Sequence, residues 1–142
     1  MSDIKSYQRL LAVQAVYEAS INQKAVSASF DELLIHLLEN VDFKNKINGS
    51  KLLLTKEIYF GVFSHLKRID ATLEGSLNNK SKIKSFDKLL LSLFRCAIYE
   101  IIMKVEISKK IVISDYLLIS NHFFGKKEAS LLNGVLDNIR KI

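Results

Sequence analysis

The side chains in this sequence that could do chemistry are mostly basic, and they form short clusters. Lys5 and Arg9 stand four residues apart, so a helix places them on one face. Three lysines share the polar stretch 78–85, and lysine pairs begin two later segments, at 109–110 and 126–127. Helix starts suit phosphate, because backbone N–H donors and the positive dipole end add to the lysine charge. The charged residues therefore favour anion binding.

Catalytic and metal-binding patterns are missing from the sequence. Neither G-x-G-x-x-G nor G-x-x-x-x-G-K-[ST] occurs, so no glycine-rich phosphate loop is expected. His36, His65 and His122 fall in different predicted helices, and one cysteine gives no pair of metal ligands. Cys96 lies in an apolar run, where a buried thiol has a raised pKa and is inert as a nucleophile. We predict a protein that is not an enzyme and uses no metal or cofactor.

Composition narrows the class of protein. The chain has 142 residues, 49% of them hydrophobic, enough for one domain with its own core over residues 1–142. The formal net charge of +6 favours anionic partners such as phosphate backbones. The single cysteine cannot form an internal disulfide, and no segment reaches the ~18 apolar residues of a membrane span. We expect a cytoplasmic protein with no membrane partner.

Helical periodicity runs through nearly the whole chain, with no proline and five glycines to interrupt it. The pattern predicts an all-α fold, a compact helical bundle of about six to seven helices. The run 86–103 is apolar on more than one face and is expected to form the central core helix. Ser29 and Glu32 match a capping box, Ser108 can cap the helix after it, and Gly125 is placed at that helix's end. The expected segments are 5–20, 29–41, 51–77 (long enough to hide a break), 86–103, 108–124 and 126–141.

The first helix, 5–20, is predicted to have two faces. One apolar arc is formed by Leu10, Val13, Tyr17 and Ile21, with Tyr7 and Gln14 beside it and Leu11 and Ala15 extending it. Lys5 and Arg9 then lie on the opposite, exposed side, where they can reach RNA phosphates. Tyr17 offers a stacking face for an unpaired base, although its angle also suits a core ring.

Four stretches of the sequence, taken together, resemble the NusB family of bacterial transcription antitermination factors. They are RLLAVQAVY at 9–17, Gly61-Val62 with Asp70, LFRCAIYE at 93–100 and NGVLD at 133–137. They follow the family's order over nearly the whole chain. The resemblance implies two packed three-helix subdomains and no enzymatic activity.

The same resemblance implies a function and partners. It implies binding of boxA-type single-stranded RNA together with small-subunit ribosomal protein S10, called NusE in this role. Within the antitermination complex on RNA polymerase, the pair would promote read-through, mainly in ribosomal RNA operons. The expected RNA-binding residues are Lys5, Arg9, Tyr17, Lys126 and Lys127. The expected structural or partner-facing residues are Gln14, Arg95, Glu100, Asn133 and Asp137.

The basic residues depart from the family pattern. Family members commonly begin with an arginine-rich run, whereas only Lys5 and Arg9 remain on that face here. Each lost phosphate contact flattens the salt dependence of RNA binding by roughly one unit of log-log slope. Lys126 and Lys127 stand where the family is often acidic, and we expect them to compensate in part for the thinned arm.

Charged residues inside the apolar run 86–103 are expected to be paired within the protein, because an unpaired buried charge is costly. Glu100 or Asp137 is predicted to pair with Arg95. Two alternatives to the antitermination reading stay open. One is a helical protein-interaction or homodimeric scaffold with weak RNA binding, which the thinned basic arm favours. The other is a detached relative of the N-terminal module of ribosomal RNA cytosine methyltransferases, which would need a separate cofactor domain.

Overall fold

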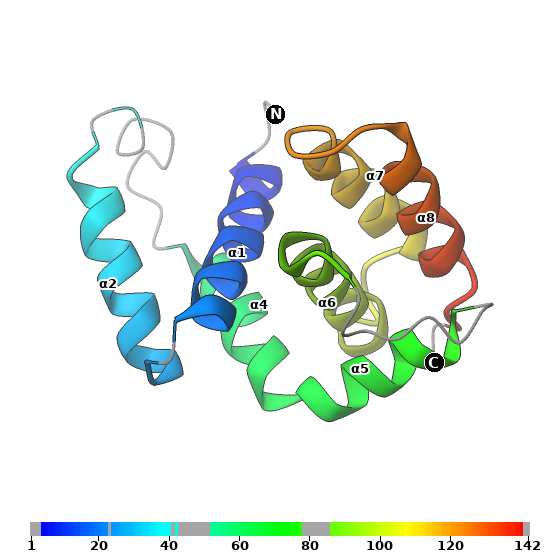
Figure 1. The fold of residues 1–142 in the computed structure, drawn as a ribbon, viewed down its shortest axis with the longest axis horizontal. Helices are drawn as coiled ribbons and strands as arrows, with labels where there is room; N and C mark the ends of the chain where they lie inside the picture. Colours follow the sequence, from blue (N-terminus) through cyan, green and yellow to red (C-terminus); the bar gives the residue numbers. More distant parts are fainter. Residues whose placement is uncertain (1–3, 23, 41, 43–51, 78–85, 141–142) are drawn as a thin grey trace.

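The computed structural model describes residues 4–22, 24–40, 42, 52–77 and 86–140. These residues form seven helices and contain no strand, which confirms the predicted all-α class (Figure 1). None of the described helices is long and apolar enough to cross a membrane. The helices are α1 (Ile4–Ile21), α2 (Val26–Leu38), α4 (Leu53–Ser64), α5 (Leu66–Gly75), α6 (Lys88–Met103), α7 (Lys109–Ser120) and α8 (Lys126–Asp137).

Helix α6 lies at the centre of the bundle, as its all-round apolar pattern predicted. It packs against α1, α4, α5, α7 and α8. Phe94 and Ile98 have no exposed surface. The carboxylate of Asp87 caps the start of α6 by accepting hydrogen bonds from the amides of Leu89 and Leu90, at 2.8 and 3.1 Å. Because α6 contacts five other helices, it fixes their positions relative to one another.

The remaining helices form two groups around this centre. Helices α1, α2 and α4 lie on one side of the molecule, and α7 and α8 lie on the other side of α6 (Figure 1). Helix α5 runs along the lower edge of this view and packs against α4 and α6. Helix α1 also packs against α6 and α7, so it forms part of the interface between the two groups of helices.

Some helix ends follow the sequence pattern and others do not. The long third segment breaks at His65, and the last helix continues through Asn133 and Gly134, both as expected. Ser108 caps α7 by accepting a hydrogen bond from the amide of Lys110, at 3.2 Å. Gly125, predicted at the end of this helix, instead lies at the start of α8. The polar stretch 78–85 falls outside the described residues.

The predicted capping box at Ser29 is wrong, because α2 begins three residues earlier, at Val26. Ser29 is buried in the first turn, and its hydroxyl accepts a hydrogen bond from the side-chain amide of Asn22, at 3.2 Å. The serine therefore helps to close α2 onto the end of α1.

Gly61 allows α4 to approach α6 closely. A Cβ atom at this position would lie 2.2 Å from Cε1 of the Tyr99 ring, well inside contact distance. The ring of Tyr99 is largely buried, so it could not move aside without repacking its neighbours. The glycine is therefore required by the packing of the two helices.

Candidate nucleic-acid interface

Helix α1 is rotated about its axis relative to the predicted orientation. Val13, Leu11 and Ala15 are buried as expected. The rest of the predicted apolar face is not buried: Leu10, Gln14 and Tyr17 are only half-buried, and Ile21 is exposed. Because α1 packs against α2, α4, α6 and α7, more than one narrow arc is covered. The buried residues of the helix are Ser6, Gln8, Arg9, Leu11, Ala12, Val13, Ala15 and Val16.

Arg9 is inside the protein, so its predicted exposed position is wrong. Only 4% of its surface is exposed. Its Nε and Nη2 atoms donate to the two carboxylate oxygens of Glu100, at 2.8 and 3.0 Å. Its Nη1 atom donates to Oδ2 of Asp115, at 2.8 Å. With these donors engaged on buried carboxylates, the guanidinium joins three helices and does not face solvent.

Two hydroxyl groups complete the cluster around Arg9. Ser6 donates to Oδ1 of Asp115 at 2.5 Å, and Tyr116 donates to Oε2 of Glu100 at 2.6 Å. Each carboxylate is therefore held by the guanidinium and by one hydroxyl. We call Ser6, Arg9, Glu100, Asp115 and Tyr116 the buried polar cluster. It links α1, α6 and α7 through side chains far apart in the sequence.

Electrostatics raise the pKa of two groups in this cluster, the guanidinium of Arg9 and the phenol of Tyr116. Burial lowers the pKa of Arg9, but hydrogen bonds and charge from Glu100, with the hydrogen bond to Asp115, outweigh burial and raise the pKa overall. Burial, with the negative charge of Glu100, raises the pKa of Tyr116 well above its usual range. The guanidinium therefore stays charged and the phenol stays neutral at ordinary pH.

Arg95 pairs with a residue that differs from both predicted partners. Its Nε and Nη2 atoms donate to the two oxygens of Asp70 on α5, each at 2.9 Å. Glu100 lies five residues further along α6, about 140° around the helix, and so faces α1 instead. The prediction that Glu100 or Asp137 pairs with Arg95 is therefore wrong.

Asp137 takes part in holding the end of α8 through its backbone. The ammonium group of Lys109 donates to the carbonyl oxygens of Asp137 and Ile139, at 2.6 and 2.8 Å. A lysine at this place satisfies carbonyls that the helix end leaves without partners. Lys109, one of the basic residues singled out for anion binding, thus has a structural contact.

The other predicted RNA-binding residues reach the surface. Lys5 is exposed near the start of α1, and Lys126 and Lys127 are exposed at the start of α8. These two helix starts both lie along the upper edge of the view in Figure 1. Tyr17 is half-buried further along α1. Exposed lysines that the sequence separates by more than a hundred residues thus stand at helix starts on one edge of the molecule.

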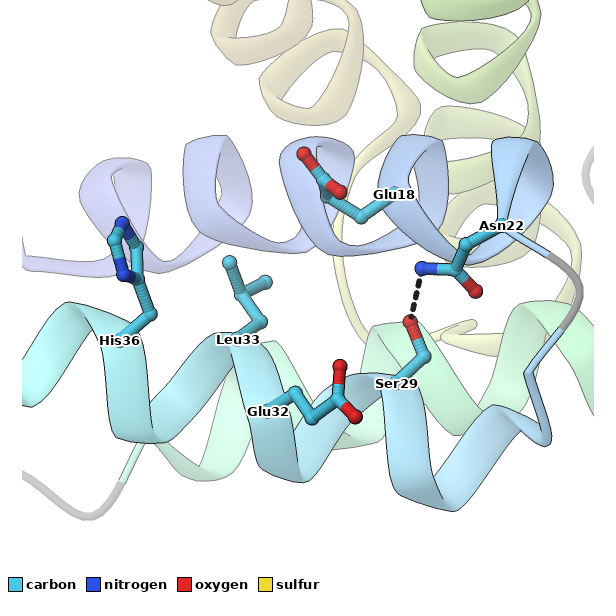
Figure 2. Close-up of a pocket in the computed structure, with 6 residues that line it drawn as sticks. All are labelled: Glu18, Asn22, Ser29, Glu32, Leu33 and His36. Carbon is cyan, nitrogen blue, oxygen red and sulfur yellow. Dashed lines mark hydrogen bonds between the residues drawn. The ribbon is translucent and has the colours of Figure 1, made fainter.

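A cleft of about 300 Å³ between α1 and α2 is lined by acidic side chains, unlike the lysine-bearing helix starts. Figure 2 shows Glu18 and Glu32 facing it from the two helices, with His36 at one end. Glu32 also forms an ion pair with Lys24 at 2.5 Å, on the exposed surface. Carboxylates on both walls disfavour a phosphate group, so this side does not suit a nucleic-acid backbone. The cleft is lined by Glu18, Asn22, Ser29, Glu32, Leu33 and His36.

Sequence reasoning missed Ser6, Asp115 and Tyr116. A usable signal was present for Asp115, because it interrupts the apolar run of α7 and a carboxylate buried there needs a cation. Its partner lies 106 residues away, and no spacing rule identifies it. Among the described residues, no group of three or more His, Cys, Asp or Glu side chains could hold a metal ion.

Comparisons with known proteins agree with this architecture. The model of the NusB family matches residues 6–141. The chain is 26% identical over 133 residues to the Transcription antitermination protein NusB of Nitrobacter hamburgensis, covering 94% of this chain and 83% of that protein. It is 28% identical over 137 residues to the protein of the same name from Novosphingobium aromaticivorans, covering 94% and 90%. The solved structure of T. maritima NusB superposes with a TM-score of 0.74 at 17% identity, covering 96% of this chain and 90% of that one.

Proposed function

Because this chain belongs to the NusB family of transcription antitermination proteins, we propose that it binds boxA-type single-stranded RNA together with ribosomal protein S10 (NusE). Residues 1–142 would act as one RNA-binding domain. In the antitermination complex on RNA polymerase, the pair would promote read-through, mainly in ribosomal RNA operons. NusB proteins are transcription factors and not enzymes.

One observation carries the proposed RNA site: the starts of α1 and α8, which hold the exposed lysines Lys5, Lys126 and Lys127, both lie along the upper edge of the molecule in Figure 1, and we call these lysines the lysine end. Lys5 stands in the first turn of α1, and Lys126 and Lys127 open α8. Lysines at helix starts add side-chain charge to the positive end of the helix dipole, which favours phosphate. Arg9 would support this surface from inside and would not contact RNA.

Residues outside this lysine end would serve stacking and partner contacts. Tyr17, half-buried on α1, would stack on an unpaired base. Asn133 and Asp137 are exposed on α8, and Gln14 is half-buried on α1, so each has surface for a partner protein. Contacts with RNA would remain mainly electrostatic.

A charge-reversal experiment tests the RNA site. In Lys126→Glu with Lys127→Glu, we expect weaker binding of boxA RNA and a salt slope flatter by about 1.4 units, at about 0.7 per phosphate contact on a single strand. Affinity should be measured for boxA and scrambled RNA at two salt concentrations, with and without ribosomal protein S10.

The matched control is Lys56→Glu with Lys67→Glu, which changes the net charge equally at exposed lysines of α4 and α5. This control should bind boxA RNA nearly as the parent does. Equal losses in the two double variants would mean that only net charge matters. An unchanged affinity of the α8 variant at moderate salt would remove these lysines from the site.

A homodimeric scaffold is the second candidate, because Ile111 and Leu118 lie two turns apart on α7 and are 57% and 53% exposed. Sedimentation of the free protein distinguishes a dimer from a monomer. The relatives compared are antitermination proteins matched over 83% and 90% of their own lengths, which disfavours a detached methyltransferase module.

A further inference from the structure

We propose that Ser6 and Asp115 are positioning residues for RNA binding: they hold Lys5, at the start of α1, in place relative to Lys126 and Lys127. The proposal rests on the proposed function of the lysine end. It means that residues of the buried polar cluster change the affinity for RNA although they do not touch the RNA.

The first step is the link between α1 and α7. Ser6 follows Lys5 directly, and its hydroxyl donates to Asp115 at 2.5 Å. Arg9, one turn further along α1, donates to the other oxygen of Asp115 at 2.8 Å. The first two turns of α1 are thus fastened at two points to one carboxylate. Since Asp115 is only 8% exposed, water competes weakly for these bonds.

The second step is the link between α7 and the start of α8. The chain leaves α7 at Ser120, and the carbonyl oxygen of that residue accepts hydrogen bonds from the amides of Phe123 and Phe124, at 3.0 and 2.8 Å. The side chain of Glu128 accepts a hydrogen bond from the amide of Gly125, at 3.3 Å. These bonds make the turn between the helices compact. Because this turn is compact, the position of α7, which carries Asp115, also fixes the start of α8, which carries Lys126 and Lys127.

The third step is the sign of the charge. The buried polar cluster holds two carboxylates, Glu100 and Asp115, against one guanidinium, so it has one excess negative charge. By simple electrostatics, removing a carboxylate near an RNA site should strengthen RNA binding. If Asp115 positions Lys5, removing its charge should weaken binding. The two accounts predict opposite signs.

The test is a double-mutant cycle on the full chain, with a boxA-type single-stranded RNA and with ribosomal protein S10 absent or present. Ser6→Ala should lower RNA affinity about three- to tenfold in the parent, but less than about twofold in a Lys5→Gln background, because the effect passes through Lys5. Ser6→Thr, which keeps the hydroxyl, should retain the affinity. Asp115→Asn should also weaken binding, measured where circular dichroism shows the variant folded.

The outcomes separate this proposal from the proposed function. If Lys5→Gln weakens binding while Ser6→Ala does not, the positioning role is overturned and the lysine end stands. If Ser6→Ala weakens binding equally in both backgrounds, the hydroxyl acts through general stability and positioning is again overturned. If Lys5→Gln leaves affinity unchanged, Lys5 does not belong to the RNA site. The positioning proposal is then overturned, and the RNA site is reduced to Lys126 and Lys127. Tighter binding by Asp115→Asn would show a plain charge effect instead.

Discussion

Two arginines, Arg9 and Arg95, join helices through ion pairs, and the two sites differ in how deeply they are buried. We call them the deep clamp and the shallow clamp. The side chain of Arg9 is 5% exposed and binds two carboxylates, Glu100 and Asp115, which are 0% and 9% exposed. The side chain of Arg95 is 13% exposed and binds one carboxylate, Asp70, which is 26% exposed. Removing one member of a buried ion pair leaves a charge without a partner and without water, whereas a part-exposed partner can be hydrated. The deep clamp should therefore be the costly one to break.

The largest expected effect is that of Arg9→Gln. The substitution leaves Glu100 and Asp115 buried without a cation, and we expect the free energy of unfolding to fall by about 3–5 kcal/mol. Chemical denaturation followed by circular dichroism measures the change. A loss below that of the Arg95 clamp would show that water reaches the deep carboxylates.

An intermediate effect is expected for Tyr116→Phe, which removes the hydroxyl that donates to Glu100 at 2.6 Å. A buried hydrogen bond to a charged group contributes about 1.5–3 kcal/mol, so stability at neutral pH should fall by this amount. Ser120→Ala, which removes a hydroxyl that bonds only within α7, is a matched control and should cost less.

The same tyrosine should affect stability at high pH. Its pKa is raised by burial and by Glu100, so above pH ~10 the unfolded chain loses the phenolic proton first. Stability is then fully present below pH ~10 and falls by about 1.4 kcal/mol per pH unit above it. Tyr116→Phe should show a flatter decline. Burial also raises the pKa of Tyr59, Tyr99 and Cys96, so part of the decline should remain.

The smallest expected effect is that of Asp70→Asn in the shallow clamp. The part-exposed guanidinium of Arg95 can be hydrated when the carboxylate charge is removed, so we expect a loss of about 1 kcal/mol or less. Added salt should narrow the difference from the parent, because salt screens exposed pairs more than buried ones. A loss equal to that of Arg9→Gln, measured by the same denaturation, would abolish the distinction between the clamps.

The sequence by itself determined the all-α class and the central core helix α6. The apolar run of α6 is hydrophobic on several faces, which requires neighbours all round, and the apolar spacing of α8 outweighed the turn signal of Asn133 and Gly134. These features depend on residues within a few turns of each other. Local spacing is enough to predict them.

Only the tertiary structure decided which face of α1 is buried and which partners its charges have. Apolar periodicity places Arg9 outside, because it counts a charge as a group that must face water. Glu100 and Asp115 lie 91 and 106 residues away from Arg9. Their carboxylates offset the cost of burying the guanidinium only when α6 and α7 pack beside α1. The same packing makes Gly61 necessary against Tyr99 and places the starts of α1 and α8 along one edge of the molecule. Such pairings arise from the arrangement of whole helices, because the burial of a charge depends on what lies opposite it in space.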